Sequence, residues 1–136
     1  LIKYNNKSTN GIVDSLIILE AVDDAATVNW GGNWRMPTIE EMGELQSECT
    51  WTFTTQNGVE GEIVTSKSNG NSIFLPAAGE CYESSRDFVG EGGLYWSSTP
   101  GEGDPLGTYC LSFRSGYHIV YWGFRYNGRS VRPVSD

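Results

Sequence analysis

The sequence predicts an α+β domain in which two helices precede a mainly antiparallel sheet with long loops. Charged residues make up only 19% of the chain, while aromatic residues reach 12% and glycines number 17. This composition favours short strands joined by tight turns over a helical bundle, which needs Ala, Leu, Glu and Lys. At 136 residues the chain is expected to be one domain, 1–136, large enough to bury a single core.

The first thirty residues predict a polar start and a first helix. Residues 1–15 are rich in Asn and Ser, and we expect them to be loosely ordered or the remnant of a longer N-terminal part. A helix is predicted over Glu20–Trp30, because acidic side chains near its start favour the positive end of the helix dipole. Gly31 and Gly32 are expected to end it, since glycine adopts φ > 0 without strain.

The block WGGNWRMPTIEEM, residues 30–42, predicts a turn and then a second helix over Ile39–Cys49. Thr38 and Glu41 have the spacing of a capping box, in which each side chain accepts a hydrogen bond from the other residue's backbone N–H. Trp30 and Trp34 are interpreted as structural core rings. No catalytic chemistry is visible in this block.

The remainder of the chain predicts strands and turns. Alternation and turn residues place strands at Trp51–Thr55, Glu60–Thr65, Ser72–Ala77, Leu94–Ser98, Thr108–Arg114, Tyr117–Phe124 and Ser130–Val134. Asn57-Gly58 indicates a hairpin, because both residues tolerate positive φ. Pro76 lacks an N–H donor, so its strand should lie or end at a sheet edge. Gly79–Gly93 is predicted to be a long acidic irregular loop, and Asn127-Gly128 to turn into the last strand.

Four ordered blocks carry a family resemblance: DDAATVNWGGNWRMPTIEEM, NGNSIFLPAAG, GGLYWSST and GRSVRPV. They resemble the Fibrobacter succinogenes major paralogous domain over about Leu19 to Val134. The resemblance implies a C-type lectin-like fold, distantly related to the formylglycine-generating-enzyme fold. It also implies a bacterial secreted or cell-surface protein, with an N-terminal portion shortened here to about Tyr4–Asp14.

Charge and cysteine content exclude several classes of protein. The net charge of −8 and the pI of about 4.5 argue against nucleic acid and against an anionic membrane surface. No apolar run approaches the roughly 20 residues of a membrane span. Cys49 is interpreted as a small buried apolar group. A lectin-like sheet would bring Cys81 and Cys110 close, and whether they form a disulfide or stay free is left open.

An enzyme is not predicted, and no cofactor is assigned. His118 is the single histidine, and nothing around it forms a nucleophile context or a multi-histidine metal site. The formylglycine-generating relatives use a pair of cysteines near the C-terminal end, whereas here only Cys110 lies in the last third. The acidic residues of the loops could supply oxygen ligands for calcium, and the alternative is that they form a solvated acidic loop. The candidate oxygen ligands are Glu80, Glu83, Asp87, Glu91, Glu102 and Asp104.

The last third of the chain is the predicted ligand-binding region. Tyrosine and tryptophan give a large contact area at low entropy cost and keep a polar tip for hydrogen bonding. Strand alternation puts Tyr117 and Tyr121 on one face and His118 and Trp122 on the other. The candidate binding residues are Tyr109, Tyr117, His118, Tyr121, Trp122, Tyr126 and Asn127. Structural roles are assigned to Trp96, Arg35, Arg129 and Arg132, since arginine stacks on rings and binds carboxylates.

We therefore expect a non-enzymatic extracellular module that binds a glycan or a surface protein. Two alternatives remain. One is a receptor-binding protein of the same fold whose C-terminal segment is diversified by a retroelement, for which Tyr117, His118, Tyr121, Tyr126 and Asn127 are suitable positions. The other is a structural or spacer domain of a larger surface protein or pilus-like assembly.

Overall fold

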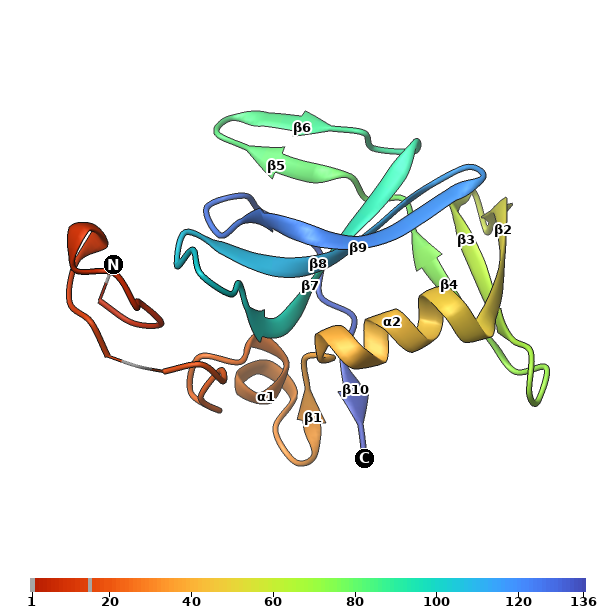
Figure 1. The fold of residues 1–136 in the computed structure, drawn as a ribbon. Coiled ribbons are helices and arrows are strands. Elements are labelled where there is room, and N and C mark those ends of the chain that lie inside the picture. Colours follow the sequence, from red (N-terminus) through yellow and green to blue (C-terminus); the bar gives the residue numbers. More distant parts are fainter. Residues whose placement is uncertain (1, 15) are drawn as a thin grey trace.

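The computed structural model describes residues 2–14 and 16–136. These residues fold into two α-helices, one short 3-10 helix and four small sheets whose strand pairs are antiparallel (Figure 1). In chain order the elements are η1 (Ser8–Asn10), α1 (Ala25–Trp30), β1 (Trp34–Arg35), α2 (Ile39–Glu48), β2 (Cys49–Gln56), β3 (Val59–Ser66), β4 (Ser72–Pro76), β5 (Glu80–Tyr82), β6 (Ser85–Asp87), β7 (Gly92–Pro100), β8 (Gly107–Arg114), β9 (Tyr117–Phe124) and β10 (Val134–Ser135). The predicted α+β class is confirmed.

Two three-stranded sheets, β2–β3–β4 and β7–β8–β9, form the body of the protein. Asn57 and Gly58 join β2 to β3 with φ of 51° and 78°, as the hairpin prediction requires. The strand that ends at Pro76 pairs only with β3 among the named strands, which confirms its position at an edge. The boundaries of β9 agree with the sequence prediction.

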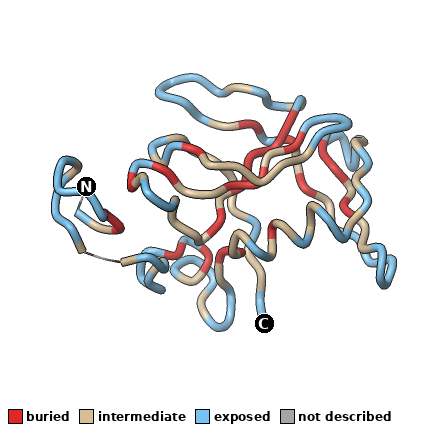
Figure 2. Tube along the Cα trace, in the orientation of Figure 1, coloured by how far each residue is buried: buried red, intermediate tan, exposed pale blue. Residues whose placement is uncertain are grey.

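The core lies where α2 and the two sheets meet, and Figure 2 shows the buried segments concentrated there. Its largest fully buried side chain is Phe113 on β8, which is 0% exposed and packs with Tyr95 at 6.1 Å between ring centroids. A Cβ at Gly93 would collide with the Phe113 ring, so glycine at this position allows β7 to approach it closely. The other buried members of the core cluster are Met42, Val64, Leu75, Ala77 and Leu111.

The capping box at the start of α2 is confirmed. Thr38 Oγ1 accepts a hydrogen bond from Glu41 N at 3.3 Å, and Glu41 Oε2 accepts one from Thr38 N at 2.8 Å. Arg35 binds both carboxylate oxygens of Glu41, at 2.8 and 2.7 Å, and also binds Asp136 at 2.7 Å. Because β1 pairs with β10, these contacts fix the C-terminal end of the chain beside the second helix.

The first helix is shorter than predicted. It begins at Ala25, because Asp24 is its N-cap and accepts hydrogen bonds from Ala26 N and Thr27 N. Asp24 also accepts from Met36 N, so it connects α1 to the segment after β1. The interpretation of Trp30 and Trp34 as core rings was wrong, since they are 57% and 42% exposed.

Two predictions for the later chain also need correction. The segment Gly79–Gly93 is not wholly irregular, because β5 and β6 form a hairpin whose turn includes Glu83 at φ 52°. The last strand does not span Ser130–Val134. Ser130 instead bridges Tyr95 in parallel and covers the free edge of β7, and β10 starts only at Val134.

The N-terminal segment is partly packed rather than loose. Tyr4 and Asn5 are 6% and 1% exposed. The carboxylate of Asp14 accepts hydrogen bonds from the backbone N–H groups of both residues, and Tyr4 Oη donates to Asp23 at 2.7 Å. This segment therefore has specific anchors on the rest of the fold.

We predict that Thr38→Ala lowers the free energy of unfolding by about 1 kcal/mol, through loss of the N-cap hydrogen bond. Urea denaturation of both proteins measures this. Thr38→Ser is the matched control, since it retains the hydroxyl and should stay close to wild type. Equal stability of the alanine and serine variants would contradict a role for the cap.

Candidate functional site

The candidate binding residues on β9 lie on two faces, as alternation predicted. His118, Val120 and Trp122 share a face with the core residues of β8, and Tyr117 and Tyr121 point to the opposite face. The predicted set therefore does not form one surface. It divides into a group at the C-terminal end of β9 and a group at the β8–β9 turn.

An exposed row of aromatic rings runs from the end of β9 to the β5–β6 hairpin. Trp122 packs edge-on against Phe124 with centroids 4.8 Å apart, and Phe124 stacks on Tyr126 at 5.0 Å and 12°. Tyr126 is followed by Tyr82 of β5, at 6.2 Å. We call Tyr82, Trp122, Phe124 and Tyr126 the aromatic row. Three of its rings are exposed: Tyr82 by 44%, Phe124 by 40% and Tyr126 by 65%.

A close approach at Gly107 and a backbone turn after Phe124 position the rings of the aromatic row. A Cβ at Gly107 would overlap the Trp122 indole, so glycine at this position allows the ring to lie flat on β8. Asn127 N donates to Phe124 O at 3.2 Å, and this turn brings Tyr126 back beside Phe124. Cys81 and Gly128 then exchange two backbone hydrogen bonds of 2.7 and 2.8 Å, which attach the β5–β6 hairpin to the same turn.

A buried ion pair lies under the turn. Arg129 Nε donates to Glu80 Oε2 at 2.8 Å, with side chains 3% and 14% exposed. Asn127 Nδ2 donates to the same oxygen at 3.0 Å, which uses the side chain of this candidate binding residue within the protein. The Arg129 guanidinium also stacks on Trp96 at 4.3 Å and donates to Cys110 Sγ at 2.8 Å. The structural roles expected of Arg129 and Trp96 agree with these contacts.

The three cysteines are free thiols in the part of the chain that the structure describes. Cys81 is exposed on β5, whereas Cys110 is 0% exposed and is contacted by Arg129. The considered disulfide between Cys81 and Cys110 is therefore not formed. Burial raises the pKa of the Cys110 thiol to about 11, an effect that the Arg129 charge opposes. Cys49 is partly buried and packs against the core cluster, close to its predicted role.

The remaining predicted residues have the following places. Tyr109 pairs with Trp122 across the sheet, and its carbonyl accepts a hydrogen bond from Ser97 Oγ at 2.8 Å. Tyr121 is half-buried beside Arg129, with 5.6 Å between the guanidinium carbon and the ring centroid. Arg132 lies near Tyr95, whose pKa is raised to about 12 by burial, and the Arg132 charge opposes that rise.

The second group of residues surrounds a hollow of about 460 Å³ at the β8–β9 turn. His118 stacks on Trp51 of β2, with centroids 4.6 Å apart and planes 9° apart. Tyr117 lines the same hollow and is 55% exposed. We call this space the β9 hollow; its lining residues are Gln46, Cys49, Thr50, Trp51, Glu62, Lys67, Gly116, Tyr117 and His118.

Glu62 brings a buried carboxyl group to the β9 hollow. It is 2% exposed and lies between Phe53 and Leu75 of the neighbouring strands. Its Oε2 has no hydrogen-bond partner among the described residues. Burial raises the pKa of Glu62 above its ordinary value of 4.5.

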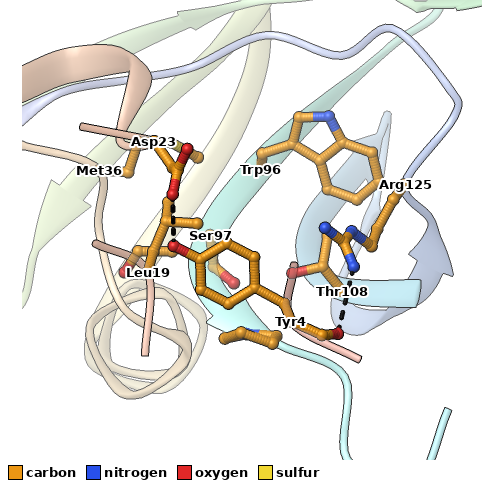
Figure 3. Close-up of a pocket in the computed structure, with 10 residues that line it drawn as sticks. Tyr4, Leu19, Asp23, Met36, Trp96, Ser97, Thr108 and Arg125 are labelled. Atoms are coloured by element: carbon orange, nitrogen blue, oxygen red, sulfur yellow. Dashed lines mark hydrogen bonds between the residues drawn. The ribbon is translucent and has the colours of Figure 1, made fainter. Parts of the chain in front are cut away.

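The concavity in Figure 3 is an internal contact of the chain. Its space is about 170 Å³, and Tyr4 lies within it between Asp23 on one side and Trp96 and Arg125 on the other. Arg125 Nη1 donates to Tyr4 O at 3.4 Å. This place serves to hold the N-terminal segment.

In residues 2–14 and 16–136 no three His, Cys, Asp or Glu side chains gather as ligands of a metal ion would. Of the acidic residues considered for calcium, Glu80 binds Arg129, and Asp104 accepts a hydrogen bond from Leu106 N in its own turn. In the same residues no helix is long and apolar enough to cross a bilayer.

No protein-family model, curated protein or solved structure matches the chain. The resemblance of the four sequence blocks to the Fibrobacter succinogenes major paralogous domain therefore stays a prediction.

Sequence reasoning missed four residues of these two sites: Tyr82, Phe124, Trp51 and Glu62. Tyr82 lies in a hairpin without apolar alternation, in a segment predicted to be irregular. Phe124 ends a correctly predicted strand, where alternation does not indicate exposure. For Glu62, the pattern EGEIVT is compatible with either face turned inward. Only the pairing of β3 with β2 and β4 shows which face is buried.

Replacing Arg129 should be strongly destabilising. We predict that Arg129→Met costs about 3–5 kcal/mol, because it leaves the Glu80 carboxylate buried without its partner. Chemical denaturation measures the loss. The double variant Arg129→Met with Glu80→Met should recover part of it, and equal losses in the single and double variants would contradict the role of the ion pair.

Glu62→Gln should make stability less dependent on pH. Because the pKa of Glu62 is raised in the folded protein, the carboxyl group loses its proton at a lower pH in the unfolded chain than in the folded one. The free energy of unfolding of wild type therefore falls as the pH rises from the unfolded-state pKa to the folded-state pKa. The glutamine variant should therefore gain stability relative to wild type from about pH 4.5 upward. Denaturation at pH 4 and pH 7 measures this, and a constant difference at both pH values would contradict the prediction.

Proposed function

We propose that the protein is a non-enzymatic, extracellular ligand-binding module that binds a neutral glycan through the aromatic row. The proposal includes the C-type lectin-like fold and the secreted or cell-surface location that the sequence resemblance implies. The observation that carries it is the continuity of the row. Two distant segments of the chain contribute its rings, and three of them stay exposed although the core nearby is well filled.

The size of the row favours a small or linear ligand. Aromatic side chains have surfaces of 150–250 Å² each, so the exposed parts of Tyr82, Phe124 and Tyr126 amount to about 300 Å². This is the size of the largest apolar patch on a typical monomer, which is often functional. A stable protein partner needs about 800 Å² per side. Sugar rings can stack on such a row one after another.

The charge around the row favours a neutral ligand. Glu80 and Arg129 neutralise each other under the turn, and Arg125 donates to the Pro105 carbonyl at 2.9 Å. The whole chain carries a net charge of −8, which disfavours anionic glycans. These three charged groups are bonded within the protein, and the rings of the row present contact surface.

A glycan array tests the proposal. Wild type should bind one or more neutral glycans, and Tyr126→Ala should weaken that binding about tenfold, which corresponds to 1.4 kcal/mol. The matched control is Trp30→Ala, because Trp30 is 57% exposed but lies on α1, outside the row. It should leave the affinity unchanged.

Two results would contradict this function. One is equal weakening by both alanine variants, which would indicate non-specific aromatic adhesion. The other is the absence of binding to any neutral glycan, together with the capture of a surface protein by wild type but not by Tyr126→Ala. That result would make the row a protein interface.

A further inference from the structure

Glu62 is a buried carboxyl group without a bonding partner. Buried carboxyl groups are normally paired or hydrogen-bonded, because removal of the charge from water is costly. Glu62 is 2% exposed, yet its Oε2 accepts no hydrogen bond from the residues that the structure describes. Its neighbours across the strands, Phe53 and Leu75, are apolar and have no side-chain donor. A group in this position can accept a hydrogen bond from a partner outside the chain.

The β9 hollow gives such a partner access to Glu62. Its volume of about 460 Å³ lies in the range of small-ligand pockets. Trp51 and His118 form one stacked wall, and Tyr117, which is 55% exposed, lies where the hollow meets solvent. The carboxyl group is thus at the inner end of a space with aromatic sides.

Three polar side chains of the hollow, those of Lys67, Trp51 and Gln46, are hydrogen-bonded to backbone groups. Lys67 Nζ donates to Ser47 O at 2.7 Å, and Trp51 Nε1 donates to Leu45 O at 3.0 Å. The side-chain oxygen of Gln46 accepts from Val120 N at 3.3 Å. Besides Glu62, the titratable groups on the lining are Cys49, Lys67, Tyr117 and His118. None of them is hydrogen-bonded to Glu62 in the described part of the chain.

We propose that the β9 hollow binds a protonated primary amine carried on an apolar stem. The ammonium group donates to the Glu62 carboxylate, and the stem lies against the stacked rings of Trp51 and His118. A charge-assisted hydrogen bond to a carboxylate is about twice as strong as a neutral one. A tryptophan ring attracts cations in addition, and the net charge of −8 raises the local concentration of cations.

Alkylamines and arylalkylamines both carry a protonated primary amine on an apolar stem, and titrations of the whole protein distinguish them. The probes are n-butylammonium and 2-phenylethylammonium, each with a neutral counterpart of similar shape, n-butanol and 2-phenylethanol. Binding is followed by the fluorescence of the five tryptophans, with calorimetry as an independent readout. We expect at least one amine to saturate, and its neutral counterpart to bind at least about tenfold more weakly.

Three variants locate the binding. Glu62→Gln keeps the shape but loses the charge, and it should weaken amine binding at least about tenfold. The matched control is Glu60→Gln, two residues away on β3 at an exposed position, which should bind as wild type does. Lys67→Met removes a neighbouring cation from the lining and should tighten binding.

The affinity should also increase with pH until Glu62 is fully ionised, while the amine remains protonated. The proposal is overturned if neither amine saturates, or if neutral counterparts bind as tightly as amines. It is equally overturned if Glu62→Gln, shown to be folded, binds like wild type. None of these probes is a glycan, and Glu62 lies outside the aromatic row, so the outcome is independent of glycan binding.

Discussion

The arrangement of the C-terminal half depends on the contacts of the Arg129 guanidinium group. It lies on the outer face of the β7–β8–β9 sheet, where it stacks on Trp96 and binds the Cys110 thiol. A Cβ at Gly123 would collide with it, so all three strands of the sheet accommodate the same group. Its ion pair with Glu80 then connects the sheet to β5. One arginine takes the place that a layer of apolar side chains would otherwise occupy.

This contact has a direct consequence for the exposed aromatic rings. The turn after β9 must return across the sheet for Arg129 to reach Glu80, and the β5–β6 hairpin is attached to the turn through Cys81 and Gly128. Tyr126 and Tyr82 are thereby brought together at the molecular surface. On the other face the same sheet packs on α2 through Leu111, Phe113 and Val120. The sheet therefore has apolar packing on one face and the Arg129 network against Trp96, Cys110 and Tyr121 on the other.

The sequence predicted the features that depend on neighbouring residues. The capping box of Thr38 and Glu41, the Asn57-Gly58 hairpin and the bounds of β9 are encoded within a few positions. It failed where distant segments decide the outcome. Trp30 and Trp34 are large and apolar, but each stays about half exposed. The last segment pairs with β1 instead of forming a longer strand.

The candidate sites show the same division. Aromatic density directed attention to Trp122 and Tyr126, which belong to the row. The density could not show that Asn127 is bonded to Glu80, or that His118 stacks on a tryptophan almost seventy residues earlier in the chain. The pattern of the sequence did not identify Glu62 as buried, because an acidic residue in an alternating strand is usually solvated. Its burial follows from strand pairing on both of its sides.

The central claim is that the aromatic row is the glycan-binding surface. NMR spectra of the aromatic side chains, recorded while a glycan that the protein binds is titrated in, test it most directly. The account predicts saturable shifts that are largest for Tyr82, Trp122, Phe124 and Tyr126, with Trp30 and Trp34 unaffected. Shifts confined to Tyr117 and His118, or largest at the exposed tryptophans of the N-terminal half, would contradict it.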